Sequence, residues 1–130
     1  MYSLAAWTLG VVFPSTPTLP GLDRIDPTPL LRQIDREATW TIRATMWASV
    51  LVFCATPLLT VYLPLPAFLL PKGLLDRHAN ALATSRFYLI RQIMLMLKTI
   101  GGLCWGAAPE VRARLTMPLY PADTGGWRRT

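Results

Sequence analysis

The chain has 130 residues, of which 52% are hydrophobic and 15% are charged, and its formal net charge at pH 7 is +6. This apolar composition excludes an intrinsically disordered chain. The basic residues form no run with interleaved aromatics, so no nucleic-acid partner is expected. Twelve prolines interrupt almost every segment, so we expect apolar surface to be buried against lipid or another chain rather than in a large core. A small, self-contained apolar helical domain is the alternative.

The sequence divides into four segments, namely 1–29, 30–70, 71–108 and 109–130. The first begins with an apolar stretch, residues 1–13, which lacks the basic n-region and cleavage site of a signal peptide and is expected to stay on the mature chain. We expect it to lie in a membrane interface or on a partner, a frayed tail being the alternative. Five prolines then predict an extended linker over residues 14–29.

A helix is predicted to follow the proline-rich linker. Thr28 is the expected N-cap and Pro29 the first helical residue, and apolar residues recur with a helical period from Leu30. Charged residues between them, such as Asp35, are expected to form a solvated face. We expect this helix to run without a break into the uncharged run of residues 44–70.

The uncharged run is the membrane candidate, because it is longer than the roughly 20 apolar residues that a helix needs to cross a bilayer. Pro57 is expected to kink the helix, and two further prolines to end it near Leu63. On the insertion scale, residues 44–63 contribute roughly −2.4 to −4.8 kcal/mol before the proline is counted, which allows insertion without compelling it. The residues expected to mark the membrane segment are Trp47, Val52, Phe53, Pro57 and Leu63.

The third segment contains a second informative stretch, residues 82–106, which predicts an amphipathic helix. Its expected N-cap is Thr84 or Ser85. Gly101 and Gly102 are expected to end or bend it.

Arg91 and Lys98 lie seven residues apart and therefore share one face of this helix. They would add about +5 to +7 kcal/mol if both lay deep in lipid, so this helix is not expected to span. Instead it is suited to packing under a membrane surface or against a protein. The fourth segment is a basic arm. The residues expected to contact a partner or lipid are Phe87, Arg91, Lys98, Trp105 and Trp127.

Residues suited to chemistry are few. The single histidine, His78, is interpreted as a surface or capping residue. Cys54 and Cys104 are interpreted as small buried hydrophobic residues without a disulfide between them. The sequence has no Gly-rich phosphate loop, metal-ligand cluster or Ser/His/Asp set, so the chain is expected to be non-catalytic, with no metal or cofactor of its own.

Four short motifs follow one another in the last part of the chain: SRFYLIR at 85–91, LK at 97–98, CWG at 104–106 and PEVR at 109–112. Together they resemble the small subunits of bacterial flavin-dependent glucose-methanol-choline-type dehydrogenases, of the gluconate-dehydrogenase small-subunit type. The resemblance implies a helical subunit that accompanies a flavoprotein, with the flavin and the catalytic histidine in that other chain. It also implies a role in folding, export or membrane attachment.

The sequence thus predicts an all-α fold with one kinked transmembrane or membrane-embedded helix, amphipathic helices and extended Pro-rich arms. We expect a non-catalytic subunit at the bacterial inner membrane that anchors or assembles a larger redox complex. Any FAD, other redox group or pigment would belong to a larger partner subunit. The alternative is a structural single-span subunit of a photosynthetic or respiratory membrane assembly.

Overall fold

The computed structural model describes residues 1–115 of the chain. Every regular element in this part is helical, which confirms the predicted all-α class. The seven α-helices and one 3₁₀ helix are α1 (Tyr2–Val12), α2 (Thr28–Glu37), α3 (Trp40–Ala55), α4 (Pro57–Thr60), η1 (Ala67–Leu69), α5 (Lys72–Ala83), α6 (Tyr88–Ala107) and α7 (Pro109–Arg114).

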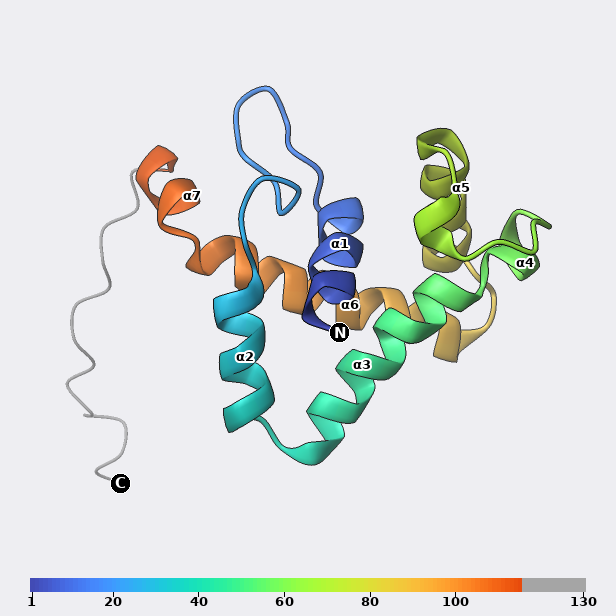
Figure 1. Cartoon of the computed structure of the whole chain (residues 1–130), viewed down its shortest axis with the longest axis horizontal. Coiled ribbons are helices and arrows are strands. Elements are labelled where there is room, and N and C mark those ends of the chain that lie inside the picture. The colour runs from blue at the N-terminus through green and yellow to red at the C-terminus, as the bar shows by residue number, and fades with distance from the viewer. Residues whose placement is uncertain (116–130) are drawn as a thin grey trace.

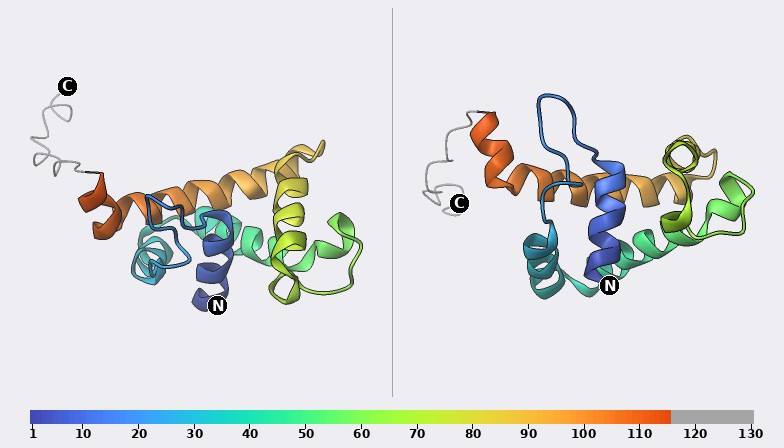
Figure 2. Two further views of the ribbon diagram at one scale, coloured as in Figure 1. Left: turned by 90° about the horizontal axis from the view of Figure 1, so that it is seen from above. Right: turned by 45° about the horizontal axis from the view of Figure 1, so that its top comes forward.

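The long helix α6 is the element on which the others assemble. It runs along the length of the molecule, with α1, α3 and α5 packed against it and α7 following at one end (Figures 1 and 2). α2 lies on the side of α1 opposite to α5 (Figure 1). The core between these helices is mostly aliphatic and aromatic, and its largest fully buried apolar side chains are Phe53, Leu9, Leu31, Met46, Leu82 and Leu97.

The uncharged run of residues 44–70 is not one kinked helix. α3 ends at Ala55, the four-residue α4 follows, and a turn with η1 leads to α5. Pro57 cannot donate the backbone hydrogen bond that would continue α3, and the Thr56 hydroxyl donates back into the last turn of α3. The expected interruption at Pro57 is confirmed, but the predicted single kinked helix is wrong, and the last α-helical residue of the run is Thr60 rather than Leu63.

A second break separates α2 from α3, where the sequence predicts a continuous helix. Ala38 and Thr39 are extended, and the chain reverses direction there (Figure 1). Asp35 stabilises this corner, because its carboxylate accepts hydrogen bonds from the Tyr2 hydroxyl at 2.7 Å and from Trp47 Nε1 at 3.3 Å. A residue assigned to a solvated face is thus half-buried where three helices meet.

No single helix within residues 1–115 combines the length and the apolar character needed to cross a bilayer. α5 and α6 together meet that requirement by length and composition, but they are bent by 117° at the short break between them. α1 and α3 are apolar helices of 11 and 16 residues.

The N-terminal stretch is packed into the fold rather than frayed. Residues 2–12 form α1, which packs against α3 and α6 and buries Ala5, Thr8 and Leu9. The contacts of α1 with α3 and α6 join residues far apart in the chain, so the periodicity of the sequence around α1 does not reveal them.

The linker after α1 is non-helical up to α2, as its prolines predict, and it is held by hydrogen bonds to both sides. The backbone N–H of Leu22 donates to the Phe13 carbonyl oxygen at 2.9 Å. Trp105 Nε1 on α6 donates to the Pro20 carbonyl oxygen at 2.9 Å. The linker is therefore part of the packed structure.

Gly21→Ala is expected to lower the free energy of unfolding by about 1–3 kcal/mol. A Cβ at Gly21 would lie 2.4 Å from backbone atoms of Phe13, Pro14 and Ser15, so the backbone would have to shift. Gly73→Ala is the matched control, because nothing lies within 4 Å of a Cβ at that position. Urea denaturation followed by circular dichroism measures both, and equal effects would contradict the close packing of the linker.

α6 differs from the predicted helix at both ends. It begins at Tyr88, because Thr84 ends α5, so neither expected N-cap is correct. It continues past Gly101 to Ala107, so the predicted end at the paired glycines is also wrong. The glycine instead allows close packing, since a Cβ at Gly101 would lie 2.4 Å from Cε2 of Phe13.

Candidate functional site

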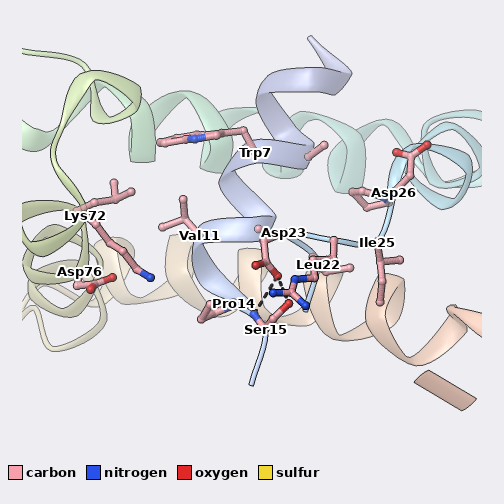
Figure 3. A pocket seen from close by; sticks show the side chains of 15 residues that line it. Trp7, Val11, Pro14, Ser15, Leu22, Asp23, Ile25, Asp26, Lys72 and Asp76 are labelled. Atoms are coloured by element: carbon pink, nitrogen blue, oxygen red, sulfur yellow. Dashed lines mark hydrogen bonds between the residues drawn. The ribbon is translucent and has the colours of Figure 1, made fainter. Parts of the chain in front are cut away.

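An open groove of about 780 Å³ lies beside α1 (Figure 3). α1 lines it with Trp7, Gly10 and Val11, the linker lines it around Leu22, and the start of α5 closes it around Leu75. Both apolar and charged side chains line it, so the groove is neither purely apolar nor strongly charged.

The charges of the groove are mixed in sign, because Asp23, Asp26 and Asp76 line it together with Arg24 and Lys72. The Asp23 carboxylate accepts hydrogen bonds from the hydroxyl of Ser15 at 2.6 Å and from its N–H at 2.9 Å (Figure 3). These bonds hold the pKa of Asp23 below its usual range. Across residues 1–115, no three His, Cys, Asp or Glu side chains are grouped so that they could hold a metal ion.

His78 is fully buried, so its interpretation as a surface or capping residue is wrong. Its Nε2 lies 2.8 Å from the Phe53 carbonyl oxygen and must donate to it, because a carbonyl only accepts. Nδ1 then accepts from the Thr60 hydroxyl. Burial lowers the pKa of His78, and the hydrogen bond to Phe53 opposes that shift. Both ring nitrogens therefore serve the packing of α3, α4 and α5.

The two cysteines are free and buried, as the sequence predicts. The Cys54 sulfur lies 3.8 Å from the Thr8 hydroxyl oxygen in the core. Burial raises the pKa of both thiols, that of Cys104 to about 11. Since the thiolate is the nucleophile and metal ligand, both cysteines act as small core residues at neutral pH.

The predicted contact residues are not brought together. Phe87, Arg91 and Lys98 are exposed along α6. Arg91 folds back and donates to carbonyl oxygens of the loop before this helix. Trp105 is half-buried near the other end of α6 and donates to the linker, so it stabilises the fold itself. Trp127 lies outside the described residues.

The residues predicted to mark the membrane segment point mostly inward. Phe53 and Pro57 are buried, and Trp47, Val52 and Leu63 are half-buried. The fold buries one side of α3 and leaves the opposite side exposed. The exposed residues of the uncharged run are therefore not the ones predicted to mark the membrane segment.

Large apolar side chains are exposed at the end of the molecule where α4 and the start of α6 both lie (Figures 1 and 2). We call this set the terminal apolar surface. Its members are Leu58, Leu59, Tyr62 and Leu65 from α4 and the following loop, and Phe87, Tyr88 and Leu89 from the start of α6. The exposed fraction reaches 84% at Tyr62 and 76% at Leu89.

Of this surface, only Phe87 is identified from the sequence. The α4 side lies within the uncharged run, where composition does not show which residues face outward. Tyr62 also has a φ of 58°, a left-handed conformation that residues other than glycine and asparagine seldom adopt. The backbone at Tyr62 thus holds a largely exposed ring in a sparsely populated conformation.

Basic residues accompany the terminal apolar surface. Between residues 38 and 109 the only acidic residue is Asp76, whereas the basic residues are Arg43, Lys72, Arg77, Arg86, Arg91 and Lys98. The Arg86 guanidinium lies over the Phe87 ring, 5.2 Å from its centroid. Of these basic residues, Arg86 and Arg91 lie beside the α6 side of the surface.

No family model, curated protein or solved structure matches the chain.

Proposed function

We propose that the chain is a non-catalytic, membrane-attached helical subunit that holds a larger redox protein at the bacterial inner membrane. The observation that supports this best is the terminal apolar surface, with its large side chains exposed at one end of the molecule. Large apolar side chains exposed at one end of a small domain are typical of a contact with lipid or protein. The resemblance of the four motifs between residues 85 and 112 to dehydrogenase small subunits favours a flavoprotein as the partner.

The use made of the reactive side chains supports a non-catalytic role. Both nitrogens of His78 are engaged in hydrogen bonds inside the core. Cys54 and Cys104 are buried thiols. The residues best able to transfer protons or form covalent intermediates thus stabilise the helices, and the reaction is assigned to the partner.

For the uncharged run of residues 44–70 we propose attachment at the membrane surface. The inward side of α3 packs Met46, Val50 and Phe53 into the core, and a bilayer-crossing helix would lose these contacts. The outward residues of α4 remain available to lipid. In place of the membrane-embedded helix predicted from the sequence, we propose that α4 and the loop after it lie in the interface by their exposed apolar residues, with α3 held in the fold.

Fractionation of bacterial cells that express the chain with its gene neighbours tests the proposal. We expect the chain in the membrane fraction, and we expect detergent to release it together with a larger protein that shows flavin absorbance. Colourless, solitary protein in the soluble fraction would contradict both parts. Recovery with several membrane subunits and no flavoprotein would instead favour the structural-subunit alternative.

Leu51→Arg distinguishes surface attachment from a span. Leu51 is 55% exposed on α3 and lies outside the terminal apolar surface. Surface attachment predicts unchanged membrane recovery and a change in stability of at most about 0.5 kcal/mol. In a spanning helix, a central arginine would cost about 2.5–3.5 kcal/mol and move the protein to the soluble or degraded pool. Immunoblotting of both fractions measures the distribution.

A further inference from the structure

We propose that the terminal apolar surface docks onto a bilayer that contains anionic phospholipid, with its apolar side chains in the interface and its basic residues at the headgroup phosphates. This inference rests on the proposed membrane attachment and specifies which face of the chain makes it and which lipid it prefers. The occupant follows from the charge and the side-chain types of the surface.

The side-chain types fit the interfacial layer of a membrane. Phe87, Tyr88 and Leu89 are consecutive and all strongly exposed at the start of α6, and Tyr62 and Leu59 are exposed on the α4 side. Tyrosine suits the headgroup level, because its ring is apolar and its hydroxyl remains hydrated. Leucine and phenylalanine reach the acyl boundary in helices that lie on a membrane.

The charges around the surface select an anionic partner. Arg86 lies in the loop just before α6 and Arg91 in its first turn, and Lys98 lies one heptad after Arg91 on the same exposed face. From residue 77 to residue 109 there is no aspartate or glutamate. Basic residues beside an inserted apolar face bind anionic lipid headgroups more strongly than zwitterionic ones.

The local contacts place the two arginines for this role. Arg86 lies over the Phe87 ring, which holds its guanidinium beside the apolar side chains. Arg91 Nη1 donates to the Ser85 carbonyl oxygen at 2.9 Å, which fixes the loop before α6 while the side chain stays exposed. Apolar and cationic groups are thus presented together at one end of the molecule.

Co-flotation of the purified full chain with phosphatidylcholine vesicles, with and without phosphatidylglycerol, tests the inference. We expect binding to rise with the anionic lipid and to fall as salt is added. The double variant Phe87→Ser/Leu89→Ser is expected to bind about tenfold or more weakly. Its matched control is Leu95→Ser/Leu103→Ser, which removes two exposed apolar residues of the same helix outside the surface and should bind like the wild type.

A charge variant tests the lipid preference separately. Arg86→Gln is expected to weaken binding to the anionic vesicles about fivefold and to leave binding to phosphatidylcholine unchanged. Arg36→Gln, an exposed arginine on α2, is the control and should have little effect on either. Circular dichroism establishes that each variant is folded.

Two outcomes would overturn the inference. If the wild type binds vesicles and the Phe87→Ser/Leu89→Ser variant binds equally well, membrane attachment stands but uses another face. If the wild type binds neither vesicle type and yet is found in the membrane fraction of cells, a protein partner covers the terminal apolar surface. If the wild type binds neither vesicle type and is also absent from the membrane fraction of cells, the proposed function itself is contradicted.

Discussion

Phe53→Ala is expected to lower the free energy of unfolding by about 3–5 kcal/mol, the range for deleting a buried aromatic ring. Phe53 is fully buried in α3. Its ring centroid lies 6.4 Å from that of Trp7 on α1 and 4.9 Å from that of His78 on α5. Because this one ring joins three helices, its loss leaves a cavity that no single element can close. Urea denaturation followed by tryptophan fluorescence measures the effect.

Leu51→Ala is the control for this variant. Leu51 lies two residues earlier on α3 but faces outward, so its truncation should change stability by no more than about 0.5 kcal/mol. The large difference between two neighbours in one helix is a direct test of which side of α3 is inside. Similar losses for both variants would contradict the observed orientation of α3.

The helical class and the proline-rich linker could be predicted because both depend on local sequence. Apolar residues at helical spacing predict α6 over most of its length, and five prolines exclude a helix between α1 and α2. Pro109 at the first position of α7, followed by Glu110 in its first turn, also follows local rules for a helix start.

The course of the uncharged run could not be predicted in the same way. The run is long enough to cross a bilayer. Its composition does not show that α1 and α6 pack against one side of α3. That pairing joins residues distant in the chain, such as Thr8 and Cys54, whose side chains meet in the core. The break at Pro57 follows from the proline, whereas the break before Trp40 depends on the contacts of Asp35 with α1 and α3.

The candidate site was predictable only on its α6 side. Phe87 and Arg91 stand out by type and spacing, but the α4 side depends on which apolar residues the fold leaves outside. Trp105 has the features of a contact residue and yet donates to Pro20, 85 residues earlier in the chain. The same types of side chain occur in the core and on the surface. Only contacts between residues distant in the chain show which of them are buried.

His78→Ala is expected to lower the free energy of unfolding by about 3 kcal/mol near pH 8, since it creates a cavity and removes two buried hydrogen bonds. The Phe53 carbonyl oxygen would lose its side-chain donor. The Thr60 hydroxyl would keep the carbonyl oxygens of Thr56 and Pro57 as acceptors, so most of the loss comes from the unpaired Phe53 carbonyl and the cavity. Asn80→Ala, at an exposed position of the same helix, is the matched control and should change stability little.

The free energy of unfolding of the wild type is expected to decrease as the pH is lowered below about 6.5. Burial lowers the pKa of His78 in the folded state, whereas an unfolded histidine titrates at about 6.5. Just below that pH the unfolded chain binds a proton that the folded chain excludes. The free energy of unfolding therefore decreases by up to about 1.4 kcal/mol per pH unit, until the pH falls below the folded pKa.

The carboxylates act in a different window, which keeps the histidine effect measurable. Asp23, Asp26 and Asp35 have lowered pKa values, the largest cause being side-chain hydrogen bonds, so their contribution is lost only as the pH falls below about 4. His78 is the only histidine in the chain. In the His78→Ala variant this decline of the free energy of unfolding between pH 6.5 and about 5 should therefore disappear. If the decline persists in the variant, another group causes it, and the prediction for His78 is wrong.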